Sequence, residues 1–132
     1  MYSEKVMEHF LRPKNLGELK DFNGVGLVGD PDCGDHLKVW IKVEEGLIVD
    51  IGFKCQGCPA AIATSSMMTE LVKGCTVEKA SEITDHLISL SLGGLPEPKE
   101  HCSNLGAQAL NEALRDYESK VGTSISNGKD QR

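Results

Sequence analysis

Five cysteines are the residues of this 132-residue chain that are best suited to chemistry. A cysteine thiolate binds soft metals and attacks sulfur, whereas a thiol in an apolar core is inert. Cys58 directly precedes Pro59, at the expected start of a helix. Cys102 follows His101 and falls in the first turn of the last expected helix. Because free backbone N–H groups and the helix dipole favour a thiolate at such positions, both cysteines are candidates for function.

Cys33 is the third candidate, and it falls in a turn between two expected strands. Gly34 permits a sharp backbone bend, which lets the Cys33 sulfur and the Asp35 carboxylate point to the same place. Turns on a rigid scaffold often supply functional side chains. The alternative is an exposed thiol that its acidic neighbours keep inert.

Cys55 and Cys75 are better explained as structural residues. Cys55 shares an expected strand face with Phe53, as a small apolar core residue would. Its C-x-x-C spacing with Cys58 also suits a redox dithiol, but that chemistry favours a βαβ context, and a hairpin strand precedes the motif here. A four-cysteine zinc finger needs a second C-x-x-C pair, which the chain lacks. Cys75 follows Gly74 at the negative end of a helix, where a thiolate is disfavoured.

The three remaining cysteines are far apart in sequence. Cys33 and Cys58 are separated by 25 positions, and Cys58 and Cys102 by 44. Only the fold can therefore bring them together. If it does, the sequence predicts a three-thiolate pocket at one end of a sheet, with Asp35 and His101 as candidates for a fourth ligand.

The elements that must position these residues follow from apolar periodicity. Residues 36–44 and 47–55 alternate as two strands of a hairpin, and glycines bracket a short strand at 24–29. Helical patterns occur at 4–10, from 59 towards 74, after Thr76, after Thr84 and around 105–117. This order predicts an α+β fold with a small three-stranded antiparallel sheet and helices packed on one face. The predicted core face carries Leu37, Val39, Ile41 and Val43 in one strand and Leu47, Val49, Ile51, Phe53 and Cys55 in the next, while Lys38, Trp40, Lys42 and Glu44 face the other way.

Length and composition restrict the remaining choices. The chain fits one domain, residues 1–120, followed by a polar tail, residues 121–132, with too little apolar surface to fold. A net charge of −6 and only six aromatic residues disfavour a nucleic-acid surface. No apolar run is long enough to span a membrane, and no export or transit signal is present. Together with the odd cysteine count, this predicts a cytoplasmic protein with reduced thiols.

A series of short motifs resembles the iron–sulfur cluster scaffold family that comprises IscU and the N-terminal domain of NifU. The resemblance extends from residue 2 to about residue 117. The motifs are Tyr2-Ser3-Glu4-Lys5-Val6, His9-Phe10, Pro13-Lys14-Asn15-x-Gly17, Cys33-Gly34-Asp35, Phe53-Lys54-x-x-Gly57-Cys58, Ala61-Ile62-Ala63-x-Ser65-Ser66 and Lys99-x-His101-Cys102-Ser103.

The resemblance implies a scaffold, not an enzyme, on which a labile [2Fe–2S] cluster is built from iron and desulfurase-derived sulfur and then passed to apo-proteins. By this likeness Cys33, Cys58 and Cys102 hold the cluster, Asp35 ligates or tunes its lability, and His101 is the alternative fourth ligand. Cys102 is the expected persulfide acceptor, because the adjacent His101 can manage its proton. The same ligands are expected to take up zinc in the apo form.

The resemblance also implies partners. These are a cysteine desulfurase, an electron donor such as a ferredoxin, a frataxin-like protein, a heat-shock chaperone, apo iron–sulfur acceptors and a second copy of the chain. Residues 95–99 resemble the chaperone-recognition motif, except that Glu97 stands where a second proline is expected.

Two alternative functions are a zinc-bound sulfurtransfer acceptor of the SufU type and a small redox dithiol protein. SufU-type relatives carry an insertion between the second and third cysteines and usually lack the histidine before the last one. This chain has His101 and no evident insertion, which favours the cluster scaffold.

Overall fold

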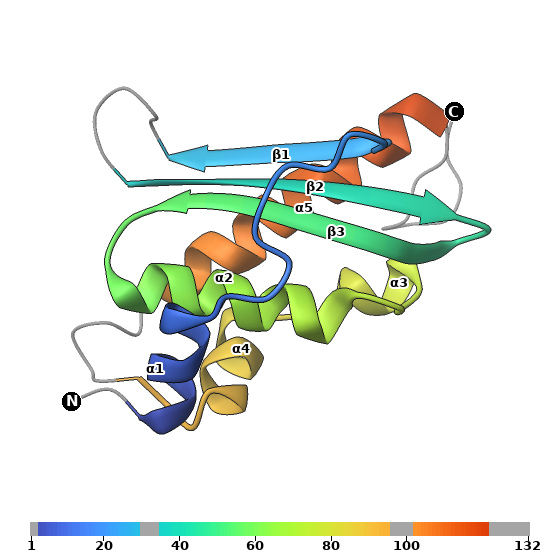
Figure 1. Ribbon diagram of the computed structural model, residues 1–132. Helices are drawn as coiled ribbons and strands as arrows, with labels where there is room; N and C mark the ends of the chain where they lie inside the picture. The colour runs from blue at the N-terminus through green and yellow to red at the C-terminus, as the bar shows by residue number, and fades with distance from the viewer. Residues whose placement is uncertain (1–2, 30–34, 96–101, 122–132) are drawn as a thin grey trace.

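The computed structural model describes the backbone of residues 3–29, 35–95 and 102–121, and the side chains of these residues except Cys102 and Ser103. It confirms the α+β class: within these residues, three strands form one sheet, and five helices accompany it (Figure 1). The elements are α1 (Glu4–Leu11), β1 (Gly24–Gly29), β2 (His36–Glu44), β3 (Leu47–Gln56), α2 (Pro59–Val72), α3 (Val77–Ala80), α4 (Asp85–Ser91) and α5 (Cys102–Val121).

The sheet has the strand order β1-β2-β3, and both pairs are antiparallel, as predicted. Gly29, His36 and Gln56 form the row of paired residues at one end. The long helices α2 and α5 pack on the same face and bury the core between themselves and the strands. The predicted core face of β2 is confirmed, since Leu37, Val39, Ile41 and Val43 are all buried.

The predicted core face of β3 is wrong in its first half. Leu47 and Val49 are both 41% exposed, whereas Ile48 between them is fully buried. The cause is a β-bulge: the pairing shifts between Lys42 and Val43 of β2, so that Val43 faces Ile48 and Val49 is the extra residue. An extra residue reverses the alternation of side chains on one side of the bulge. Strict alternation along the whole strand therefore fails.

The opposite face of the sheet is partly covered by the chain that links α1 to β1 (Figure 1). Gly17 N donates to Phe53 O (2.7 Å) and Phe53 N donates to Asn15 O (3.1 Å), so this segment lies along β3. A side chain at Gly52 would collide with the Gly17 carbonyl oxygen, so glycine is required there. Trp40, the cross-strand partner of Gly52, is only 3% exposed, although its strand pattern predicts an outward position.

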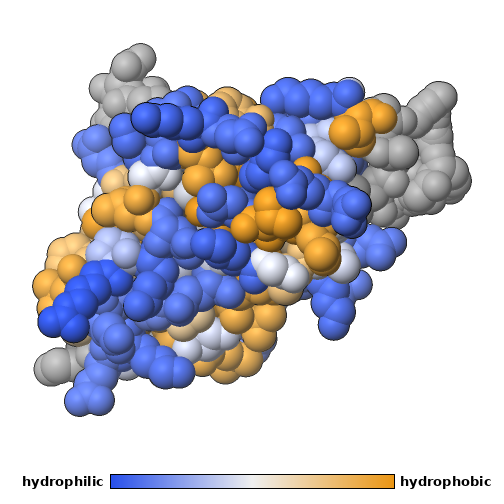
Figure 2. Space-filling view, turned by 45° about the vertical axis from the view of Figure 1, so that its right-hand side comes forward, coloured by the Kyte–Doolittle hydropathy of each residue, from blue (hydrophilic) through white to orange (hydrophobic). Residues whose placement is uncertain are grey.

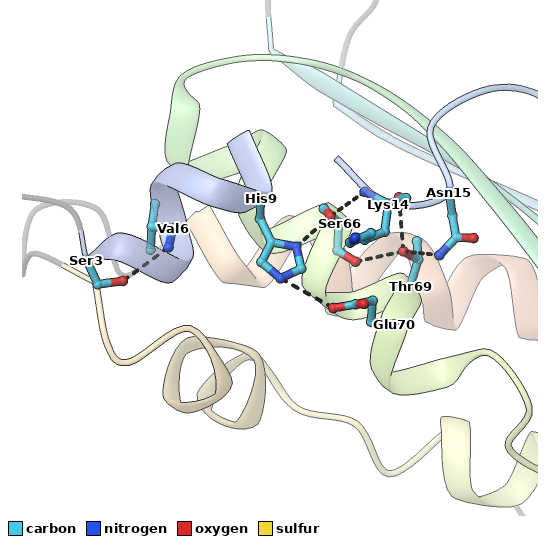
Figure 3. A network of polar contacts seen from close by, with 8 residues as sticks. All are labelled: Ser3, Val6, His9, Lys14, Asn15, Ser66, Thr69 and Glu70. Carbon is cyan, nitrogen blue, oxygen red and sulfur yellow. Dashed lines mark hydrogen bonds and ion pairs between the residues drawn. The ribbon is translucent and has the colours of Figure 1, made fainter. Parts of the chain in front are cut away.

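Helix α1 is held against α2 by a buried polar contact at His9 (Figure 3). His9 Nδ1 lies 2.7 Å from Ser66 Oγ, which also accepts a hydrogen bond from Lys14 N (2.8 Å). His9 Nε2 lies 3.3 Å from Glu70 Oε1. Burial lowers the pKa of His9, and the nearby Glu70 carboxylate opposes that effect. The imidazole is therefore a neutral, fixed link between the two helices at physiological pH.

Polar and charged residues cover most of the surface in Figure 2, with apolar residues in separate small patches. No helix in the part of the chain that the structure describes is long and apolar enough to cross a membrane. Of the predicted tail, only Val121 is described, and it ends α5.

Candidate functional site

Asp35 and Cys58 come together at one end of the sheet. Asp35 immediately precedes β2, and Cys58 follows β3 as the N-cap residue of α2. The carboxyl carbon and Oδ2 of Asp35 lie 3.5 Å and 3.6 Å from the position that a Cβ atom on Gly57 would take. The Asp35 carboxylate therefore lies beside the turn that leads into Cys58. The tighter neighbour of such a Cβ atom is the Ala61 side chain, at 3.1 Å.

The start of α5 is brought to the same end by close packing on β1. A Cβ atom on Gly24 would lie 2.7 Å from the carbonyl oxygen of Ala113, and one on Gly26 would collide with the backbone at Ala109. Helix α5 and strand β1 therefore run in opposite directions along each other. Cys102 lies about 10 Å beyond Ala109 along the helix, at about 1.5 Å per residue. Gly29 lies about 10 Å beyond Gly26 along the strand, at about 3.3 Å per residue. The first residue of α5 and the last residue of β1 therefore reach the same end of the molecule, as Figure 1 shows.

Two predicted site residues, Cys33 and His101, lie outside the described residues, as does the side chain of Cys102. The residues that flank the segment containing Cys33 are Gly29 and Asp35, and both are at this end of the sheet. The structure thus places Asp35 close to the Gly57–Cys58 turn, and the backbone of Cys102 at the same end of the molecule. The convergence of all three sulfurs stays a prediction.

Cys58 has the helix-start environment that the sequence predicts. Its backbone is extended (φ −74°, ψ 168°), Pro59 is the first residue of α2, and the Cys58 carbonyl accepts a hydrogen bond from Ile62 N (3.2 Å). The side chain is half-buried against the core. Unsatisfied N–H groups in the first turn of a helix stabilise an anion there. This environment favours the thiolate that a metal or a sulfur donor requires.

Cys55 lies beside the site but has the opposite character. The pKa of Cys55 is raised to about 11, chiefly by burial. A side-chain hydrogen bond with Ser65 lowers this pKa, and the nearby charges of Asp35 and Cys58 raise it. The group is thus a neutral thiol at physiological pH, which supports the prediction of a packing residue. Ser65 is a neighbour that the sequence analysis did not single out. The sequence signal is its place seven residues after Cys58, two turns further along one face of α2.

Cys75 also behaves as a structural thiol. Its Sγ donates a hydrogen bond to the Leu71 carbonyl oxygen (3.1 Å) in the last turn of α2. This contact holds the sulfur against the last turn of the helix, which supports the prediction of a structural residue.

The described residues alone do not form a metal site. No group of three His, Cys, Asp or Glu side chains among residues 3–29, 35–95 and 104–121 is arranged to hold a metal ion. Asp35 and Cys58 supply two candidate donors, an oxygen and a sulfur. A complete ligand set at this end of the sheet requires Cys33, His101 or the side chain of Cys102.

Comparisons with known proteins agree on one group. Residues 1–124 match the family model described as NifU-like N terminal domain. The chain is 53% identical over 122 residues to the iron–sulfur cluster assembly scaffold protein IscU 1 of Archaeoglobus fulgidus, covering 92% of this chain and 80% of that protein. It is 50% identical over 123 residues to IscU of Aquifex aeolicus, a scaffold protein of the same description, covering 92% and 78%. The fold resembles the crystal structure of an N-terminal NifU-like protein from Brucella abortus, with a TM-score of 0.68, 20% identity, and coverage of 89% and 94%.

Proposed function

This chain belongs to the family of NifU-like N-terminal domains, and from that premise we propose that it is a scaffold for iron–sulfur cluster assembly. It receives iron and desulfurase-derived sulfur, holds a labile [2Fe–2S] cluster, and passes the cluster to apo-proteins without acting as an enzyme. The observation that carries the proposal is the sequence identity of about half to relatives named as such scaffolds over most of the chain. The proximity of Asp35 to the Gly57–Cys58 turn, with the start of α5 at the same end of the molecule, supports it.

The proposed ligand set explains how such a protein both holds and releases its cargo. Four cysteine thiolates are the usual ligands of a durable [2Fe–2S] cluster. Here Cys33, Cys58 and Cys102 supply three, and the fourth is an oxygen of Asp35 or a nitrogen of His101. The non-sulfur ligand binds iron more weakly than a thiolate does, and an acceptor thiol enters at this coordination position. Asp35 is exposed, so a carboxylate at this corner is open to an approaching acceptor.

Cys102 is the proposed first acceptor of sulfur. Its thiolate attacks the sulfane sulfur of the desulfurase persulfide, so that a new S–S bond forms on Cys102 and the desulfurase thiolate leaves. The His101 imidazole then exchanges a proton with the sulfur group on Cys102. In a Cys102→Ser variant we expect no stable sulfur transfer to residue 102, measured by mass spectrometry of the intact protein. Transfer at the unmodified rate in that variant would exclude this role.

The decisive experiment is anaerobic reconstitution with iron, cysteine and a cysteine desulfurase, followed by addition of an apo-ferredoxin. We expect visible cluster absorbance on this protein, then cluster in the ferredoxin. Stoichiometric zinc with no visible cluster after reconstitution would instead support a zinc-bound sulfur acceptor. Zinc in the isolated protein alone does not separate the two, because the same ligands bind both metals.

The proposed function requires a sulfur donor, an electron donor and acceptor proteins as partners. A frataxin-like protein, a homodimer and a cytoplasmic location are further predictions. So is the heat-shock chaperone, whose predicted recognition segment continues beyond Leu95 into residues outside the described part of the chain.

A further inference from the structure

The sheet face opposite α2 and α5 carries two neighbouring lysines that form no ion pair among the described residues. Lys38 of β2 and Lys54 of β3 are direct cross-strand partners, and both are exposed. Like charges in directly opposed positions destabilise an antiparallel pair. None of the ion pairs among the described residues includes either lysine. Within the described residues, a chain of net charge −6 thus places two lysines that have no ion-pair partner there in directly opposed positions.

Leu27 of β1 completes this row, because it pairs with Lys38 on the other side and is 45% exposed. We call Leu27, Lys38 and Lys54 the basic row. It lies about 7 Å, two residues of about 3.3 Å each, from the row of Gly29, His36 and Gln56 that borders the candidate site.

The basic row is not covered by the linking chain in the described structure. That chain contacts the next row inward, where Gly17 lies against Gly52 and Trp40 is buried. The Lys38 ammonium is instead held over the Trp40 ring, 5.2 Å from its centroid. A cation–π contact of this kind fixes the direction of the side chain without neutralising its charge. The row therefore presents a positioned cation, a second cation and an apolar side chain.

We propose that the basic row docks a small acidic electron-transfer protein, which presents carboxylates beside an apolar residue. The inference rests on the proposed function, because sulfane sulfur must be reduced to sulfide before it enters a cluster. The reaction is R–S–SH + 2 e⁻ + H⁺ → R–SH + HS⁻. The S–S bond breaks, the terminal sulfur leaves as hydrosulfide, and the donor protein loses one electron in each of two encounters.

Charge complementarity identifies this partner. The repulsion between Lys38 and Lys54 disfavours the free protein and is relieved when carboxylates approach both ammonium groups. Leu27 offers an apolar contact at one end of the row, beside the charged pair. Electron-transfer encounters use small interfaces, and a row of three residues beside the site suits a brief one.

The test compares Lys54→Glu with Lys79→Glu, a control that changes the net charge equally. Lys79 lies on α3, which contacts the far end of the sheet through the Leu47–Thr76 bridge. Each protein is reconstituted anaerobically with iron, cysteine and desulfurase. One series uses a reduced acidic [2Fe–2S] ferredoxin as the electron source, and the other uses dithiothreitol.

For Lys54→Glu we expect ferredoxin-driven assembly to slow by about tenfold at low ionic strength, with a smaller loss as salt rises, because steering by charge is screened. Dithiothreitol-driven assembly should not change. The melting temperature should stay level or rise, since the new carboxylate faces Lys38 and replaces repulsion with attraction. Lys79→Glu should match the parent in both series. Lys54→Gln, which removes the charge without reversing it, should give an intermediate loss.

The inference is overturned if Lys54→Glu keeps the parent rate with ferredoxin, or if Lys79→Glu slows equally. It also fails if Lys54→Glu slows the dithiothreitol series as much, which would point to the desulfurase as the occupant or to a damaged site. A parent protein that builds clusters with dithiothreitol but not with ferredoxin refutes the docking alone. A parent that builds none with either refutes the proposed function.

Discussion

At the scale of the residue, position within an element determines the chemistry of a side chain. Cys55 and Cys58 are three residues apart, yet one is a hydrogen-bonded thiol near the end of a strand and the other begins a helix. Desolvation favours the neutral thiol at Cys55, whereas helix N–H groups favour the thiolate at Cys58. Asp35 is exposed and lies beside Gly57, which leaves it available to ligate or to release. These environments decide which of the neighbouring groups suits a metal.

Removing the Asp35 carboxylate should make the cluster more persistent. If Asp35 assists release, an Asp35→Ala variant will lose visible absorbance more slowly than the parent, because no carboxylate at residue 35 then helps the cluster to leave. The measurement is cluster decay after anaerobic reconstitution, with Asp50→Ala as a control away from the site. Equal lifetimes for parent and Asp35→Ala would remove Asp35 from the release step.

Replacing His101 tests the identity of the fourth ligand. If its imidazole ligates iron, His101→Ala will shift the visible absorption and circular dichroism of the reconstituted cluster, since a nitrogen ligand is lost. His86→Ala, on the exposed surface of α4, is the matched control. An unaltered spectrum in His101→Ala would favour Asp35 as the ligand.

At the scale of the element, the connections between helices and strands set the geometry of the site. The β-bulge in β3 shifts the alternation so that Ile48 and Phe53 both reach the core. Close approach at Gly24 and Gly26 fixes the direction of α5 along β1. The neutral imidazole of His9 joins α1 to α2, the helix that Cys58 begins (Figure 3).

The His9 link predicts a loss of stability in mild acid. Because burial lowers the pKa of His9 in the folded protein, the unfolded chain binds its proton at a higher pH. The stabilising effect of the neutral form is therefore present above the ordinary value of 6.5 and is lost as pH falls below it. We expect the free energy of unfolding to fall between pH 7.5 and 5.5, measured by urea denaturation.

The matched variants separate this effect from other titrations. His9→Gln should be less stable than the parent at pH 7.5, because the contact with Ser66 is altered, but should lose less stability on acidification. His86→Gln should follow the parent, since His86 is exposed. A His9→Gln curve parallel to that of the parent would rule out His9 as the titrating group.

At the scale of the whole molecule, the proposed site joins three separate parts of the chain. Asp35 enters from the connection between β1 and β2, Cys58 from the junction of β3 and α2, and Cys102 from the start of α5. A ligand that binds only when these parts are together stabilises the folded state. The same end of the sheet lies beside the basic row, so the proposed cargo site and the proposed docking surface are neighbours.

Cluster loading should therefore raise the melting temperature. We expect the reconstituted protein to unfold several degrees above the apo-protein, with the difference abolished when a chelator removes the iron. Cys58→Ser should show a much smaller rise, whereas Cys75→Ser should behave as the parent because its thiol is at the far end of α2. No rise in the parent would mean that the bound cluster does not connect these elements.

The amino-acid sequence by itself determined the fold class, the bounds of β2 and the start of α2, because strict alternation and a Cys-Pro helix start are local signals. It also distinguished the helix-start position of Cys58 from the strand position of Cys55 and the helix-end position of Cys75, since all three positions follow from local signals. The tertiary structure alone decided that Val49 faces solvent, that Trp40 is buried and that Lys38 stands opposite Lys54. Bulges, covering segments and strand register arise from contacts between residues distant in sequence, and no local pattern encodes them.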